Sequence, residues 1–216
     1  MAHPLRDRNF RLLFTGRVVD QLGDGVSPAA LTLAIIIATR SSAGLAVVLV
    51  CALLPKVTLL PIGGVVVDRL GPRRVAMAAA VVSAAAQLSI GLLLLAGHID
   101  FPLIAMASAI KGTASAFDTP ATLPLVAGTT DGDGRQAANA LMGIAASATN
   151  LAGPALAGVL IFTAGAGWAF VLDAATFVFS AGTLALIRVR PVHAPRRSLR
   201  ADLAAGWVEV RTRTWY

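Results

Sequence analysis

The segment GVVVDRLGPRR, residues 64–74, separates two long apolar stretches of the chain. Its Gly71 and Pro72 favour a tight reversal, because glycine reaches unusual backbone angles and proline presets one. Arg69, Arg73 and Arg74 surround that reversal. Short loops rich in Lys and Arg stay on the cytoplasmic side of a membrane. The segment therefore predicts a cytoplasmic turn between two membrane helices.

Similar apolar stretches extend on both sides of this turn. A helix needs about 20 residues to cross a hydrocarbon core of about 30 Å. Six stretches reach that length: residues 12–38, 43–67, 75–96, 101–126, 137–164 and 168–187. None shows the period-2 alternation of a membrane β-barrel. We expect an all-α membrane protein with six transmembrane helices.

The composition agrees with a membrane protein. Of the 216 residues, 56% are hydrophobic and only 13% are charged, against about 25% charged residues in soluble domains. The net charge of +7 could indicate nucleic-acid binding. The arginines, however, gather at the ends of apolar stretches with no aromatic residues between them, so we expect the lipid bilayer and not nucleic acid as the partner.

The basic residues also predict the orientation. Fifteen of the 18 fall at the N-terminal end and in the loops on the same side, whereas the opposite loops hold only Arg40. By the positive-inside rule both termini are cytoplasmic, in a multi-pass protein of the cell's cytoplasmic membrane. The first apolar stretch is not a signal peptide, because it carries Arg17, Asp20 and Asp24 and lacks a cleavage site.

The composition changes after the sixth stretch. We expect residues 1–187 to form the helical bundle and residues 188–216 a basic linker with an amphipathic helix, because apolar residues recur there near the helical period. A tail lying on anionic headgroups is the alternative. Trp215 and Tyr216 look like the interfacial entry to another membrane helix, so we expect the chain to stop before a second half.

Residues 64–74 resemble the signature loop of the major facilitator superfamily, Gly-x3-Asp-Arg-x-Gly-x-Arg-Arg. Every defined position matches: Gly64, Asp68, Arg69, Gly71, Arg73 and Arg74. The resemblance implies the N-terminal half of a twelve-helix fold, built from two inverted three-helix repeats. It also implies that this loop is a gate, whose acid bonds to a helix N-terminus in the missing C-terminal half when the transporter opens outward.

Two further segments resemble family motifs. In IKGTASAFDTPATLPL, residues 110–125, Lys111 stands where the family more often has Arg before Gly. The segment NLAGPALAG, residues 150–158, is similar to the Gly-Pro-x-x-Gly-Gly motif of proton-coupled drug exporters, with Gly153, Pro154 and Gly158 in place. Ala157 replaces a closing glycine, so a bend that serves only helix packing is an equal reading.

The opening NFRLLFTGRVVDQLGDGV, residues 9–26, and FVLDAATFVFSAGTL, residues 170–184, resemble a drug-exporter subgroup. That subgroup includes macrolide efflux proteins and enterobactin exporters.

Charges inside a membrane helix are costly and need a reason. Asp20 and Asp24 lie four residues apart on one helical face, with Gln21 beside them. Two neighbouring carboxylates disfavour double ionisation, which suits proton binding. We expect Asp24 to carry a proton or a cationic substrate, and Asp20 to be neutralised by Arg17.

Four more charged or polar positions remain inside the helices. Lys111 would set the charge of a central cavity, and Lys56 could pair with Asp24 or Asp20 as a structural or a substrate contact. We expect structural roles for both Asp118 and Asp173. Asp118, near the cytoplasmic end, would cap a helix or pair locally, and Asp173 would lie about one turn into the sixth helix, near the outer membrane surface.

No catalytic or metal-binding set is visible, so we expect neither an enzyme nor a cofactor. The interpretation is a secondary transporter that exports amphipathic or hydrophobic small molecules by alternating access, driven by protons. A siderophore or lipid exporter is one alternative. A six-helix scaffold or regulatory subunit without transport is another.

Overall fold

The computed structural model describes residues 4–39, 42–130 and 134–188. These residues form a short 3-10 helix and six long α-helices, which confirms the all-α prediction. In chain order they are η1 Pro4–Arg6, α1 Arg8–Thr39, α2 Ser42–Leu70, α3 Pro72–Leu95, α4 Phe101–Thr129, α5 Arg135–Ala164 and α6 Ala166–Leu186. Several helices are longer than the predicted apolar stretches, because polar residues at their ends are also helical. The predicted amphipathic helix lies outside the described residues.

Among the described residues, four helices are long and apolar enough to cross a membrane: α2, α3, α5 and α6. The other two, α1 and α4, carry charged side chains in their middle turns. Charges inside a membrane helix almost always face the bundle interior or a water-filled cavity, where they find a partner.

The predicted reversal at Gly71 is present. α2 ends at Leu70, and α3 begins at Pro72. Gly71 has φ of +88°, a left-handed value that glycine adopts without steric cost. Pro72 occupies the first turn of α3, where its missing N–H leaves no hydrogen bond unmade. A single residue therefore suffices to connect the two helices.

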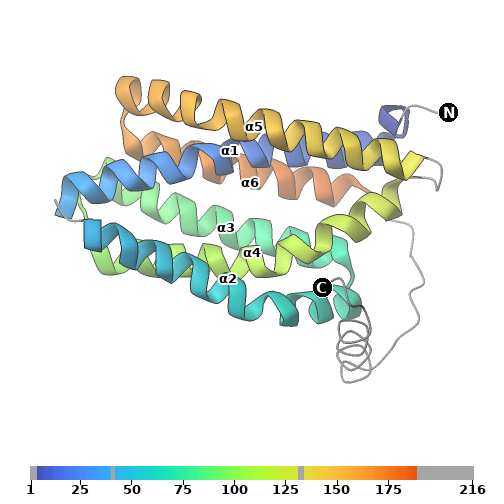
Figure 1. Cartoon of the computed structure of the whole chain (residues 1–216), viewed down its shortest axis with the longest axis horizontal. Helices are drawn as coiled ribbons and strands as arrows, with labels where there is room; N and C mark the ends of the chain where they lie inside the picture. Colours follow the sequence, from blue (N-terminus) through green and yellow to red (C-terminus); the bar gives the residue numbers. More distant parts are fainter. Residues whose placement is uncertain (1–3, 40–41, 131–133, 189–216) are drawn as a thin grey trace, which may run out of the picture.

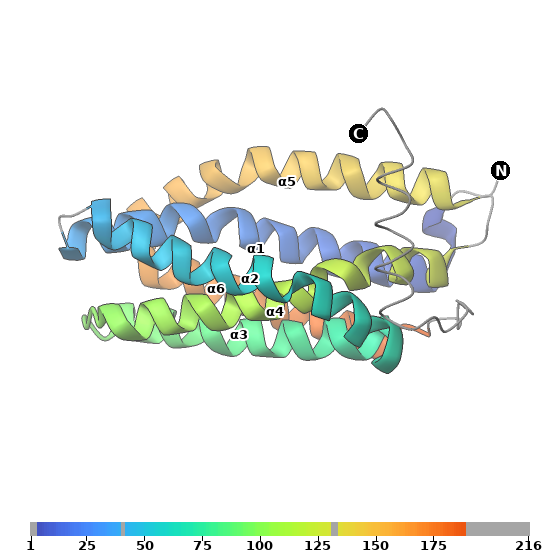
Figure 2. The same ribbon diagram turned by 60° about the horizontal axis from the view of Figure 1, so that its bottom comes forward.

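The six helices run lengthwise beside one another (Figure 1). α1 packs along α5 and α6, α4 packs along α2 and α3, and contacts between α3 and α6 join the two groups. Figure 2 shows α5 and α3 at opposite edges of the bundle. α1 and α4 have little packing against each other, so other forces must hold their facing sides.

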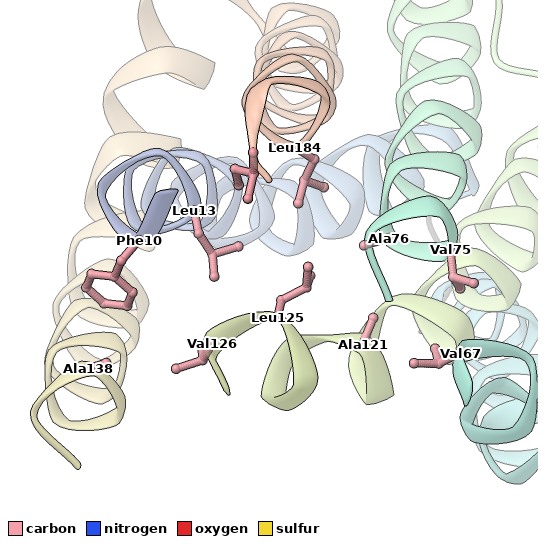
Figure 3. Packing of buried hydrophobic residues seen from close by; sticks show 11 residues of the cluster. Phe10, Leu13, Val67, Val75, Ala76, Ala121, Leu125, Val126, Ala138 and Leu184 are labelled. Carbon is pink, nitrogen blue, oxygen red and sulfur yellow. The ribbon is translucent and has the colours of Figure 1, made fainter. Parts of the chain in front are cut away.

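Two apolar clusters lie on either side of a polar layer. One cluster gathers the N-terminal part of α1 with the C-terminal parts of α4 and α6, and Figure 3 shows Leu13, Leu125 and Leu184 converging there. The second cluster includes Ile104 and Phe170 from the other ends of α4 and α6. The middle turns of α1 and α4 lie between the clusters and carry the charges.

The outer surface is apolar on α2 and α5. Large side chains such as Leu54, Val57, Leu151 and Phe162 are exposed there. A water-soluble protein rarely exposes so many large apolar side chains together. Lipid or another apolar partner therefore covers these faces.

Candidate functional site

Two ion pairs bridge α1 and α4. Arg17 binds Asp118 in a bidentate pair, with Nη1–Oδ2 at 2.6 Å and Nη2–Oδ1 at 2.9 Å. Lys111 binds Asp24, with Nζ–Oδ1 at 2.9 Å. On each helix the two charged residues are seven apart, which is about two turns. Because the helices run antiparallel, α1 supplies the cation of one pair and the anion of the other.

Lys111 holds a second carboxylate, that of Asp173 on α6. The distance from Nζ to Asp173 Oδ2 is 3.0 Å. The Asp173 side chain is fully buried, whereas that of Asp24 is 49% exposed. One ammonium group therefore joins an open carboxylate to a buried one. The ring of Phe177 lies 5.2 Å from the ammonium and adds a cation–π contact.

Polar side chains of α1 and α3 contact Oδ2 of Asp173, whereas its Oδ1 is buried without a hydrogen-bond partner among the described residues. Ser27 Oγ on α1 and Gln87 Nε2 on α3 both donate to Asp173 Oδ2. Gln87 also donates to Ser27 Oγ at 2.7 Å. These contacts let Asp173 stay buried while it remains bound to Lys111, because buried charges require both a partner and hydrogen bonds.

The depth of Asp173 along the sixth helix was readable from the sequence, but the face on which it lies was not. Asp173 lies in the interior, where α1, α3, α4 and α6 meet, and the depth along a helix does not reveal which face turns inward. Gln87 was missed by the sequence reasoning. Its signal was a single amide among the alanines and leucines of residues 75–96, where a polar side chain has to find a partner.

The structure also differs at Lys56 and Asp118. Lys56 on α2 is half-buried and makes no ion pair with Asp24 or Asp20 in the part of the chain that is described. The cation beside Asp24 is Lys111 instead, because α4 and not α2 brings its charged face to α1. Asp118 neither caps its helix nor pairs locally, since its partner Arg17 is on α1.

Asp20 and Gln21 lie near these bridges. Asp20 is buried, and its Oδ2 is 3.7 Å from Arg17 Nη1. Thr149 Oγ1 of α5 donates to Gln21 Oε1 at 3.5 Å, so Gln21 faces α5. Asp20 therefore belongs to the Arg17 group, whereas Gln21 contributes to the contact between α1 and α5.

In the Lys111–Asp24 pair, each charged residue is followed directly by a glycine in its own helix. Gly25, next to Asp24, lies against Gly153 of α5, where an added methyl group would sit 3.0 Å from the Gly153 Cα. Gly112, next to Lys111, lies against Ala52 of α2, and a methyl group there would overlap the Ala52 carbonyl oxygen. Both glycines let the neighbouring outer helix approach closely.

Within the described helices, two of the remaining motif glycines have no close helix neighbour. Gly158 has no neighbouring atom within 4 Å of an added methyl group among the described residues, although Gly153 and Pro154 lie on the same helix. Gly64 likewise has none, and its neighbour Gly63 is the residue that packs, against Ala116. Gly64 and Gly158 therefore serve no helix contact within these six helices.

The α2–α3 turn with its arginines, residues 64–74, lies at the end of the bundle that holds the N-terminus of α1 (Figure 1). Arg73 reaches α6, where its Nε donates to the Leu184 carbonyl at 2.7 Å and its Nη2 to the Ala185 carbonyl at 2.6 Å. A cation is favourable at a helix C-terminus. Asp68, Arg69 and Arg74 are exposed, and Asp68 has no hydrogen bond or ion pair to any described residue. Asp68 is thus free to bind a group outside these helices.

Of the two carboxylates that bind Lys111, the one on Asp24 is open to its surroundings. No group of three or more His, Cys, Asp or Glu side chains that could hold a metal ion occurs among the residues described.

Comparison with known proteins agrees with this architecture. The family model of the Major Facilitator Superfamily matches residues 13–216. No curated protein matches the chain. The family match begins in α1 and includes all five of the other helices. The chain therefore belongs to the Major Facilitator Superfamily, and it is a multi-pass membrane protein from a family of secondary transporters that handle small molecules.

Proposed function

We propose that these helices form one half of a proton-coupled exporter of amphipathic or hydrophobic small molecules that works by alternating access. The observation that carries this proposal is the position of Lys111 between Asp24, which is half exposed, and Asp173, which is fully buried. Because Asp24 is accessible and its partner Lys111 has a second carboxylate, a proton or a cationic substrate can replace Lys111 at Asp24.

The charge balance explains the exchange. With all three groups ionised, Lys111, Asp24 and Asp173 carry one net negative charge. A proton or a cationic substrate that binds Asp24 neutralises that charge. Lys111 can leave Asp24 at that moment and remain paired with Asp173, which avoids the large cost of an unpaired charge inside the membrane. Asp24 is therefore the exchangeable group, and Lys111 sets the charge around it.

The proposed topology has six spans, two inverted three-helix repeats and cytoplasmic termini. The packing supports the repeats, because α1 with α5 and α6 mirrors α4 with α2 and α3. The charged residue followed by glycine recurs at Asp24–Gly25 and Lys111–Gly112. In this fold the binding site lies near the midplane between repeats, which is where the proposal places Asp24 and Lys111.

The proposal includes a second six-helix half, reached through residues 188–216, in the cytoplasmic membrane. The exposed apolar faces of α2 and α5 support a covering of lipid or protein. Asp68, exposed and unpaired within the described helices, supports a gate that binds the N-terminus of a helix in that half. Gly64, Arg69, Gly71, Arg73 and Arg74 would shape and position the gate.

The experiment is efflux of a fluorescent cationic drug from cells that express the full-length natural protein. Asp24→Asn should abolish efflux that depends on the proton gradient, while leaving membrane expression intact. Asp100→Asn is the matched control, because Asp100 caps α4 outside the polar layer and asparagine caps equally well. Unchanged efflux by Asp24→Asn would refute the proposal.

A further inference from the structure

Arg17, Asp20 and Asp118 form a second group with one cation and two carboxylates, next to the Lys111 group. Asp118 occupies both terminal nitrogens of Arg17 at 2.6 and 2.9 Å. Asp20 stays at 3.7 Å, outside hydrogen-bond distance. The Arg17 guanidinium therefore hydrogen-bonds to Asp118, and Asp20 is left without a hydrogen-bonded cation in the described helices.

Asp20 is also enclosed and incompletely bonded. The residue is only 6% exposed, and its Oδ1 is buried without a hydrogen-bond partner. The Nε of Arg17 is likewise buried and without a partner. A buried ionised carboxylate without hydrogen bonds is strongly unfavourable. Either a proton on Asp20 or a turn of Arg17 toward it would remove that cost.

Among the described residues, Arg17 is the one cation within ion-pair distance of Asp20, and Lys56 of α2 makes no ion pair with it. On its own helix the nearest charges are Arg17 and Asp24. On α4, Asp118 is held by Arg17, and Lys111 is held by Asp24 and Asp173. On α6 the charged side chain is Asp173, and residues 136–164 of α5 contain none. Apart from pairing with Arg17, the Asp20 carboxylate can therefore be neutralised only by binding a proton.

We propose that Asp20 is a second proton-binding site, controlled by the choice of Arg17 between Asp118 and Asp20. While Arg17 is bound to Asp118, an Asp20 carboxylate oxygen takes a proton from water and becomes a neutral acid. When Arg17 turns to Asp20, the O–H bond breaks, the proton returns to water and a guanidinium N–H donates to the carboxylate. No electrons are transferred.

The exchange links proton release to helix movement. The Arg17–Asp118 pair bridges α1 and α4, so separation of these helices frees Arg17 to bind Asp20 on its own helix. This inference rests on the proposed proton-coupled function, but it concerns a different carboxylate from Asp24. The sites also differ in access, since the Asp24 side chain is 49% exposed and that of Asp20 is 8% exposed.

The test is infrared difference spectroscopy of the full-length natural protein in phospholipid vesicles, with pH changed across the neutral range. The carboxylic acid C=O stretch reports protonated side chains. Asp24→Asn serves as the background, so that Asp24 contributes nothing. In that background a carboxylic acid band should remain, disappear with Asp20→Asn and return with Asp20→Glu. Asp118→Asn should also remove it at neutral pH, because Arg17 is then free to bind Asp20.

A band that persists in the Asp20→Asn variant, or that is unaffected by Asp118→Asn, would overturn the proposal. The return of the band with Asp20→Glu ties the band to a carboxyl group at this position. The drug-efflux measurement on Asp24→Asn is independent of this band. If Asp24→Asn leaves efflux unchanged, the proposed function fails but the infrared band can still be assigned to Asp20. If the band is not that of Asp20, this inference fails while the efflux result stands.

Discussion

The bidentate pair of Arg17 and Asp118 is the shortest of the salt bridges that join α1 to α4, with Nη1–Oδ2 at 2.6 Å. It lies about two helical turns from the bridge of Lys111 and Asp24 at 2.9 Å. The two bridges use opposite charges on each helix, so the antiparallel order of α1 and α4 is the one that satisfies both.

Arg17→Gln should destabilise the chain more than Asp118→Asn. The first change leaves Asp20 and Asp118 without their shared cation, at a cost of roughly 3–5 kcal/mol for a broken buried pair. The second leaves Arg17 free to bind Asp20, which offsets part of the loss. Thermal unfolding in detergent measures the difference. Equal destabilisation would show that Arg17 cannot turn to Asp20.

Gly153→Leu should weaken the bundle, because Gly153 lies against Gly25 of α1 and a side chain would force α5 away. Gly158→Leu on the same helix is the matched control, since no atom of the described residues approaches it. We expect a loss of about 1–3 kcal/mol from overpacking at Gly153 and little change at Gly158. Unfolding of residues 1–216 in detergent tests this. A greater loss at Gly158 would contradict the contact.

Arg73→Gln should loosen the end of α6, because it removes two hydrogen bonds from a cation to the Leu184 and Ala185 carbonyls. The expected loss is about 1–2 kcal/mol. Amide hydrogen exchange at the last turn of α6 should rise with it. Arg74→Gln, at an exposed position of the same loop, should leave that exchange unchanged; an equal rise there would point to a general charge effect.

Asp68→Asn in the full-length natural protein should cut transport several-fold, while expression stays near normal. Asp68 is exposed and bonded to no described residue, so its loss removes no contact within these helices. Its proposed partner, a helix N-terminus, is attracted by a negative charge, which asparagine lacks. Drug efflux measured beside membrane expression checks this. Normal efflux by the variant would show that the Asp68 carboxylate has no role in gating.

The topology can be tested with single cysteines in a Cys51→Ala background. His98→Cys should react with a membrane-impermeant reagent from outside, since His98 is exposed in the link between α3 and α4. His193→Cys should react only after permeabilisation, because the arginine distribution places that end in the cytoplasm. The reverse pattern would invert the proposed orientation.

The long apolar stretches were enough to predict the helices, because length and hydropathy alone set a membrane helix. The Gly71–Pro72 reversal also followed from local chemistry. The partners of the charges did not, since pairing depends on which faces meet after packing. Asp173 is the clearest case: its depth in the helix was readable, but its inward direction was not.

One signal in the sequence was overlooked. Arg17 and Asp24 are seven residues apart, as are Lys111 and Asp118, and the order of the charges is reversed. If the first and fourth helices are equivalent and antiparallel, as the resemblance implied, that reversed spacing pairs Arg17 with Asp118 and Asp24 with Lys111. The two bridges could have been predicted from spacing once the helices were placed together.

The scarcity of packing between α1 and α4 makes their junction compliant. Dispersion contacts weaken sharply once surfaces part by about an ångström. The attraction between opposite charges falls only inversely with distance, and it is strong where water is scarce. Locally, the facing sides of α1 and α4 can therefore tilt while a restoring pull persists, although the extensive packing of α3 against α6 still holds the two helix groups together.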